Sequence, residues 1–169
     1  MKIQIKVLNK EFYKKEKLGG EYYDLPSYQT FGSAAMDLCC TEDITIYPGE
    51  TRLISTGLAI WIGSDKWGHT DICTMGVIVP RSGLGTRGLI LANTIGVIDE
   101  DYQGELKLSA WNRHTPNEET TLHKIILNAG DRIAQLIFVP IIRAQWGIVD
   151  DFESKTNRGD GGFGSTGTA

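Results

Sequence analysis

Short stretches of alternating apolar and polar residues run along the chain and predict β-strands. In the clearest case, leucine or alanine occupies positions 106, 108 and 110, and polar or amphipathic side chains stand between them. Further candidates lie at residues 3–7, 44–47, 53–62, 72–79, 95–98, 123–127, 133–142 and 145–149. Successive side chains of a strand point to opposite faces, so a period of two is typical of half-buried strands. Many short strands at this spacing predict an all-β sandwich or barrel.

The segments between these stretches are rich in turn-forming residues, for example at 47–50, 115–117 and 128–131. No segment carries a long apolar stripe of period 3.6, and a single short helix fits, at residues 82–87, where two glycines weaken it. Residues 9–32 are predicted to form a long polar loop and residues 112–121 an exposed hairpin connection. We therefore expect one domain over residues 1–156 and a flexible, glycine-rich tail over residues 157–169.

Composition narrows the classes of protein that remain. The chain has 169 residues, 41% of them hydrophobic, which suits a single domain with a real core. A net charge of −4 argues against binding to a nucleic acid polymer, although a few arginines can still hold a small anion. Three cysteines, two of them adjacent, make neither a disulfide framework nor a zinc site. The N-terminus shows no secretory signal and no apolar run approaches the roughly 18 residues of a membrane span, so we expect a soluble, cytoplasmic protein.

The tail at residues 157–167 reads NRGDGGFGSTG and has the composition of an anion-binding segment. Two glycines bracket four residues before Ser165 and Thr166, as in a P-loop, but the lysine, the preceding strand and the following helix are all lacking. Glycines still let backbone N–H groups approach an anion, and Arg158 adds a forked cation. The alternative is a disordered solubilising tail, in which the bulky Phe163 would be unusual.

Two other segments combine basic and polar side chains. Arg81, Ser82 and Gly83 follow a predicted strand and offer donors for phosphate oxygens, although Ser82 could equally be a helix N-cap. Arg132 and Gln135 stand at the start of a later apolar strand. Arg132 could form a structural salt bridge, and Gln135, if buried, needs a hydrogen-bonding partner that a phosphate could supply.

Four carboxylates stand within the seven residues 99–105. A calcium loop is a poor match, because Gln103 and Ala110 stand where such a loop needs other residues. A hairpin turn with a solvated acidic edge is one interpretation. In the functional interpretation, Asp99 at a strand end is a partly buried general base, Asn93 hydrogen bonds to a base edge, and the ring of Tyr102 packs on a sugar.

Taken together and in this order, five segments resemble the motifs of the trimeric dUTPases (deoxyuridine triphosphate nucleotidohydrolases). They are residues 34–38, 80–85, 96–105, 132–136 and 158–167, and the resemblance runs from about Phe31 to Gly167. The first contains Asp37, which by itself could be a turn carboxylate or a contact to a hydrated metal ion. In that segment Ala35 stands where the family usually has glycine. The resemblance implies a jelly-roll-type β-barrel that assembles as a homotrimer, with active sites at the subunit interfaces.

It also implies an activity. Enzymes of this family hydrolyse dUTP to dUMP and pyrophosphate by water attack on the α-phosphorus, with Mg²⁺ held by the triphosphate. They thereby limit uracil incorporation into DNA and supply dUMP for thymidylate synthesis. Asp99 matches the catalytic aspartate, which orients and deprotonates the water, and Asp37 would bind a metal-coordinated water.

The remaining motif positions match substrate contacts. Contacts to the α- and β-phosphates would come from Arg81, Ser82, Gly83 and Gln135. The uracil pocket, which leaves no room for a 5-methyl group, would be formed by Asn93, Val97, Ile98 and Lys107. Tyr102 would stack under the deoxyribose and exclude a 2′-hydroxyl. Phe163 would cover the uracil, and the γ-phosphate would be reached by Arg158, Gly164, Ser165 and Thr166.

Two alternatives share parts of this pattern. A dCTP deaminase of the same superfamily would differ at Gly83 and would use a glutamate base, so Gly83 and Asp99 argue against it. A regulatory protein that binds dUTP without turning it over is disfavoured as the sole role by the complete set of catalytic-type residues. As a second role it stays open.

Overall fold

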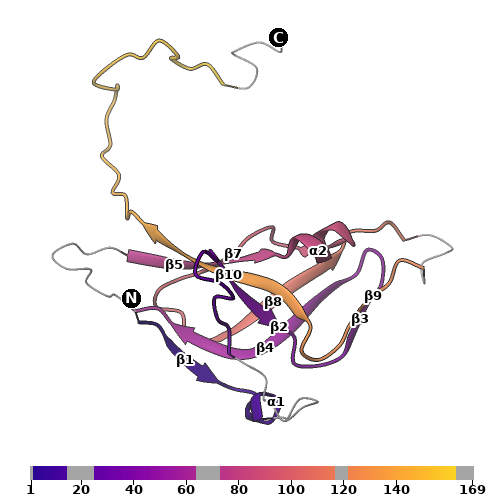
Figure 1. The fold of residues 1–169 in the computed structure, drawn as a ribbon. Coiled ribbons are helices and arrows are strands. Elements are labelled where there is room, and N and C mark those ends of the chain that lie inside the picture. The colour runs from indigo at the N-terminus through magenta and orange to yellow at the C-terminus, as the bar shows by residue number, and fades with distance from the viewer. Residues whose placement is uncertain (1, 15–24, 64–72, 117–121, 163–169) are drawn as a thin grey trace.

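The computed structural model describes residues 2–14, 25–63, 73–116 and 122–162 (Figure 1). Ten strands and two short helices follow one another along these residues: β1 (Gln4–Val7), α1 (Lys10–Lys14), β2 (Met36–Cys39), β3 (Ile44–Ile46), β4 (Thr51–Trp61), β5 (Cys73–Pro80), α2 (Ser82–Thr86), β6 (Leu89–Leu91), β7 (Gly96–Ile98), β8 (Glu105–Asn112), β9 (Ile125–Leu127) and β10 (Arg132–Ile141). The expectation of an all-β protein is confirmed. None of the described helices is long and apolar enough to cross a membrane.

Two four-stranded sheets enclose the core. The first sheet has the order β1-β4-β8-β6 and the second β2-β10-β5-β7, while β3 and β9 form a separate antiparallel pair. All strand pairs are antiparallel, as expected of a jelly-roll-like fold, and the two sheets are not joined into one closed cylinder. The core cluster draws on both sheets, with Ile54 and Leu108 from the first and Leu38, Ile78 and Leu136 from the second. The alternation at residues 105–111 therefore places every second side chain of β8 in this core.

Sequence patterns missed three elements for identifiable reasons. β2 and β6 are too short to show a period, and β6 is the uninterrupted apolar run Leu89–Leu91. α1 lies within the predicted polar loop, where the Asn9 side chain accepts a hydrogen bond from the backbone N–H of Phe12 (3.0 Å) and caps the helix. Phe12 is buried, and the Tyr13 hydroxyl donates to the Thr56 carbonyl (2.9 Å), so two aromatic side chains hold this turn against β4.

The segment after β10 leaves the two sheets altogether. Residues 142–162, called the C-terminal arm from here on, contain no helix or strand and extend away from the body of the molecule (Figure 1). The strand predicted at residues 145–149 is therefore wrong for this chain on its own. Trp146 and Ile148 alternate as in a strand but are 99% and 98% exposed. A strand needs a neighbour for its backbone hydrogen bonds, and the arm has none within the described residues.

Candidate active site

A cavity of about 380 Å³ opens between β7 and the strands β4, β6 and β8 of the first sheet. It brings together six of the residues singled out from the sequence: Asn93, Val97, Ile98, Asp99, Tyr102 and Lys107. β7 supplies Val97 and Ile98, the turn that follows supplies Asp99 and Tyr102, and β8 supplies Lys107. Leu53 and Ser109 also line the cavity, and the motifs did not reveal them. The alternation along β8 could have found Ser109, because it puts Ser109 on the same face as Lys107. This cavity has the size and mixed lining of a small-molecule site.

The loop before β7 contains a strained backbone conformation that hydrogen bonds hold in place. Thr94 has a φ of 60°, which is the left-handed region and is disfavoured for a β-branched residue. Its backbone N–H donates to the Leu91 carbonyl (3.0 Å), and its hydroxyl donates to the Asn93 carbonyl (2.6 Å). The next N–H, of Ile95, also donates to the Asn93 carbonyl (2.6 Å). Several hydrogen bonds thus fix the backbone of Asn93 at the rim of the cavity.

Asp99 ends β7 and begins a tight turn. The backbone N–H of Tyr102 donates to the carbonyl of Asp99 (3.2 Å), which closes a four-residue turn. The expectation that Asp99 is partly buried is wrong for the single chain, in which it is exposed. The reason is that β7 is the outermost strand of its sheet, so among the described residues no strand covers the turn that follows on its outer side.

Tyr102 is held against the start of β8. Its hydroxyl donates to the carbonyl of Glu105 (2.9 Å), so the ring lies along the cavity wall with a fixed tilt. Gly104 makes this approach possible, because a Cβ at that position would collide with the tyrosine hydroxyl. The glycine of this segment is therefore required by a close contact with the tyrosine side chain.

Glu105 connects the cavity to β4 and was not given a role from the sequence. Its Oε1 accepts hydrogen bonds from the Ser55 hydroxyl and from the backbone N–H of Gly57 (3.0 Å), and its Oε2 lies 3.3 Å from Lys107 Nζ. Partial burial acts to raise the pKa of Glu105, but these hydrogen bonds and the lysine charge outweigh it and lower the pKa below its usual range. The ionised carboxylate therefore orients Lys107 along the wall of the cavity.

A second, more open cavity of about 530 Å³ is rich in arginine. Its lining includes Arg81, Gly83, Arg87 and Arg132, from the turn after β5, the helix α2 and the start of β10. β5 connects the two cavities, since it pairs with β7 and leads directly into Arg81. The first cavity has a mixed polar and apolar lining, and the second presents three arginine side chains that would attract an anion.

Two of the three arginines that line the second cavity pair with one carboxylate. Asp37 Oδ1 lies 2.7 Å from Arg81 Nε, and Asp37 Oδ2 lies 3.3 Å from Arg132 Nη1. The salt bridge predicted for Arg132 is therefore confirmed, with Asp37 as its partner. Gln135, opposite Asp37 in the β2–β10 pairing, is half-buried and donates to the Pro80 carbonyl (3.0 Å), so its partner is a backbone group.

The predicted short helix is confirmed as α2, but the possible capping role of Ser82 is wrong. Arg81 is the N-cap residue of α2 and makes no side-chain cap hydrogen bond, and Ser82 is the first helical residue. Because Ser82 lies inside the first turn, its exposed hydroxyl is not used to satisfy the helix end. Together with Gly83 it faces solvent next to the arginines.

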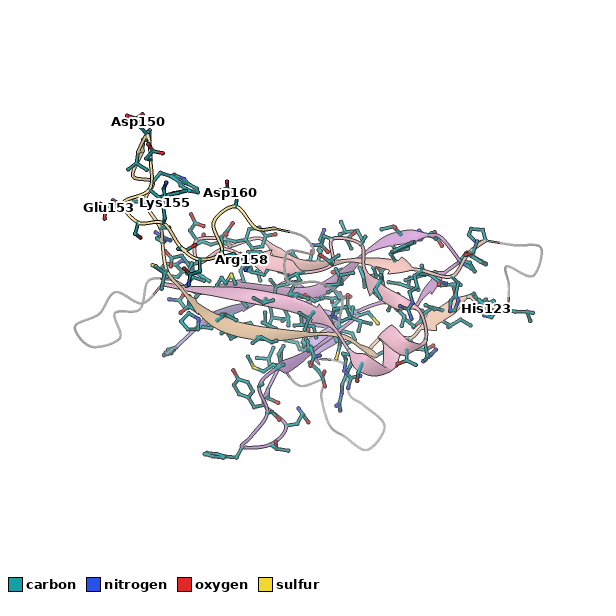
Figure 2. The ribbon with its side chains drawn as sticks, turned by 90° about the horizontal axis from the view of Figure 1, so that it is seen from above. His123, Asp150, Glu153, Lys155, Arg158 and Asp160 are labelled. Carbon is teal, nitrogen blue, oxygen red and sulfur yellow. The ribbon has the colours of Figure 1, made fainter. Side chains whose placement is uncertain are left out.

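The tail residues are placed only in part. Figure 2 shows Arg158 and Asp160 on the C-terminal arm, far from His123 at the opposite end of the molecule. Arg158 lines neither cavity, and its Nε donates to the Gly161 carbonyl (2.9 Å) within the arm. Four predicted contacts lie outside the described residues: Phe163, Gly164, Ser165 and Thr166.

The chain is similar to known proteins over most of its length. The dUTPase family model matches residues 21–167. The deoxyuridine 5'-triphosphate nucleotidohydrolase of Coxiella burnetii is 48% identical over 168 residues, which cover 98% of this chain and 96% of that protein. A solved structure of the dUTPase of Staphylococcus bacteriophage 80alpha with dUPNHPP superposes with a TM-score of 0.78 at 26% identity and covers 99% of both chains.

The fold is also similar to that of a dUTPase mutant from phage phi11 of S. aureus, whose structure is described as revealing the coordination of a structural Mg(II) ion. That match has a TM-score of 0.74 at 21% identity and covers 91% of this chain and all of the other. Within the described residues of the present chain, no cluster of three His, Cys, Asp or Glu side chains is placed to hold a metal ion.

Proposed function

The chain belongs to the dUTPase family, and we propose that it hydrolyses dUTP to dUMP and pyrophosphate. One observation carries this proposal: strand β5 connects a cavity suited to a nucleoside with a cavity rich in arginine. It pairs with β7, which lines the first cavity, and leads directly into Arg81, which lines the second. The family match over residues 21–167 and the 48% identity to a named dUTP nucleotidohydrolase support the same activity.

In this proposal Asp99 is the general base. Its carboxylate accepts a proton from a water molecule while the water oxygen attacks the α-phosphorus, and the bond to the bridging oxygen breaks so that pyrophosphate leaves. General-base catalysis of this kind contributes roughly 10²- to 10⁴-fold. The exposure of Asp99 in the single chain suits a site that other subunits of the assembly complete.

The nucleoside would occupy the first cavity. We assign the base to Asn93, to the backbone of Val97 and Ile98 and to Lys107, and the deoxyribose to the ring of Tyr102. The fixed backbone around Asn93 and the hydroxyl contact of Tyr102 support these assignments, since selectivity requires pre-positioned groups. A methyl group on the base or a 2′-hydroxyl on the sugar would then meet a wall.

The phosphates would occupy the second cavity. Arg81, the exposed Ser82 and Gly83 would contact the α- and β-phosphates, and Gln135 would join them by exchanging its contact with the Pro80 carbonyl. Mg²⁺ bound to the substrate would neutralise phosphate charge and orient the phosphates for displacement. The donor set fits an ion held mainly by phosphate oxygens, because the described residues offer it no cluster of three ligating side chains. Asp37, already paired with two arginines, would contact it through water at most.

The tail would act as a lid and the arm as an assembly element. Residues 157–169 would close over the bound nucleotide, with Phe163 on the uracil and contacts to the γ-phosphate from Arg158, Gly164, Ser165 and Thr166, so that water is excluded. The alternating exposed Trp146 and Ile148 on the arm support a homotrimer, since another chain would cover such side chains. The sites would then lie at subunit interfaces.

A substrate panel tests the proposed function. The protein is mixed with each dNTP and with UTP, with and without a chelator, and release of pyrophosphate and ammonia is measured. Pyrophosphate from dUTP alone, abolished by the chelator, is the expected result. Ammonia from dCTP would indicate a deaminase instead, and tight dUTP binding without turnover would indicate a regulatory binding protein.

A further inference from the structure

Among the residues that the structure describes, a single polar contact ties the C-terminal arm to the body of the molecule. Arg143 Nη2 forms an ion pair with Glu100 Oε1. The other hydrogen bonds of the arm, around Thr156, Arg158 and Gly161, stay within the arm. Across the parts of the chain that the structure describes, no second hydrogen bond or salt bridge joins residues 142–162 to the two sheets. The direction in which the arm leaves the body is therefore set at Arg143.

The two partners come from strands that are not neighbours. Arg143 follows the end of β10 at Ile141, and Glu100 follows the end of β7 at Ile98. β5 lies between these strands, with Ile141 opposite Cys73 and Ile98 opposite Gly76. The ion pair therefore bridges the N-terminal end of β5 and joins the root of the arm to the turn that begins at Asp99.

Glu100 is the more constrained partner. Its side chain is 14% exposed, whereas that of Arg143 is 64% exposed, and its Oε2 is buried with no hydrogen-bond partner among the described residues. Its backbone carbonyl accepts a hydrogen bond from the N–H of Gly63 (3.0 Å), just beyond the end of β4. A largely buried carboxylate with one cationic partner depends strongly on that partner. A shift of Arg143 would consequently be felt at Glu100, and through it at the adjacent Asp99.

We propose that Glu100 and Arg143 are positioning residues that couple the arm to the catalytic turn. The pair holds the root of the arm at Arg143 and the turn after β7 in one fixed relation, so that the position of the arm and the placement of Asp99 depend on each other. An arm whose root is held in one place raises the effective concentration of the tail that it carries. A small displacement of a catalytic group such as Asp99 has a large effect on rate. The inference rests on the proposed function and assigns these two residues a part in it.

Kinetics of four full-length variants test the coupling: Glu100→Gln, Arg143→Gln, the combination of both, and Arg143→Lys. We expect each glutamine variant to raise KM for dUTP roughly three- to tenfold, in the range for loss of one partly exposed ion pair. The combined variant should be no worse than either single one, because both break the same contact. Arg143→Lys, which keeps the charge, should restore much of the affinity. A thermal melt of each variant checks that the fold is retained.

A second comparison separates action through the arm from general loosening. Phe163→Ala weakens the proposed lid, so adding Arg143→Gln to it should cost less than the product of the two separate effects. Arg52→Gln is the matched control, since it removes another exposed ion pair (Arg52 Nε to Glu50 Oε1, 2.6 Å) outside both cavities, and should change KM less than twofold.

Three results would overturn the inference: Arg143→Gln kinetics within twofold of the unmodified protein, an effect of Glu100→Gln without one of Arg143→Gln, or full multiplication with Phe163→Ala. Absence of dUTP hydrolysis by the unmodified protein would instead refute the proposed function on which the inference rests, so the two failures are distinguishable.

Discussion

Replacement of Asp37 by asparagine should weaken catalysis by loosening two arginines at once. The carboxylate holds Arg81 at 2.7 Å and Arg132 at 3.3 Å, one on each oxygen. Asparagine keeps one oxygen that can accept a hydrogen bond from one arginine. Its NH₂ group replaces the other oxygen and faces the second guanidinium, and because both groups are donors they cannot hydrogen bond to each other. A hydrogen bond to a charged group contributes about 1.5–3 kcal/mol when well buried. Since the two arginine side chains are 36% and 52% exposed, about 1 kcal/mol for each contact is the better figure.

The sum, about 2 kcal/mol, corresponds to a fall of roughly thirtyfold in kcat/KM if both arginines act on the phosphates in the transition state. Pyrophosphate release from dUTP, measured over a titration of Mg²⁺, gives this ratio. Asp43→Asn is the control, because Asp43 accepts a hydrogen bond from the backbone of Ala129 (2.8 Å) and lines neither cavity. A change of less than threefold in Asp37→Asn would refute the argument. So would a loss that saturating Mg²⁺ repairs, which would instead support contact of Asp37 with a metal-bound water.

Three further predictions concern the proposed general base Asp99, the tail, and the carboxylate of Glu105 in the wall of the first cavity. Asp99→Asn should keep dUTP affinity, measured by calorimetry, but lose roughly 10²- to 10⁴-fold in turnover; near-normal turnover would rule out the base assignment. A chain that ends at Asn157 should keep its fold by circular dichroism but lose most activity, whereas unfolding would show the tail to be structural. Because the pKa of Glu105 is lowered in the folded state, its stabilising contribution is present above the unfolded-state pKa and is lost as pH falls through the folded-state value. Glu105→Gln should thus flatten the acid side of a plot of melting temperature against pH, and an unchanged slope would contradict this.

The sequence predicted those parts of the site that are contiguous in the chain. Asn93, Asp99 and Tyr102 fall within thirteen residues, 93–105, and the loop before β7 together with the short turn after it suffices to bring them to one cavity. The alternation along β8 likewise predicted which of its side chains face outward. In each case local geometry decides the outcome, so a local pattern can reveal it.

Contacts between distant segments could not be predicted in this way. The role of Glu105 depends on an irregularity of β4 between Ser55 and Ala59, where the register with β8 shifts. No periodic signal marks that irregularity, and the amide that reaches the carboxylate belongs to Gly57, which has a φ of 66°. The arm shows the opposite limitation: its residues do alternate, but a strand also requires a partner strand, and the described residues offer it none.

The strained backbone at Thr94 has a consequence for efforts to make the protein more heat-resistant. A β-branched residue held at a φ of 60° lowers the stability of the fold by of order 1–3 kcal/mol, so Thr94→Gly should raise the melting temperature. The same change would remove the hydroxyl contact to Asn93 and let the loop sample other shapes. Thermostability and discrimination between bases would then change in opposite directions, and a screen for heat resistance alone would tend to select variants that no longer distinguish uracil well.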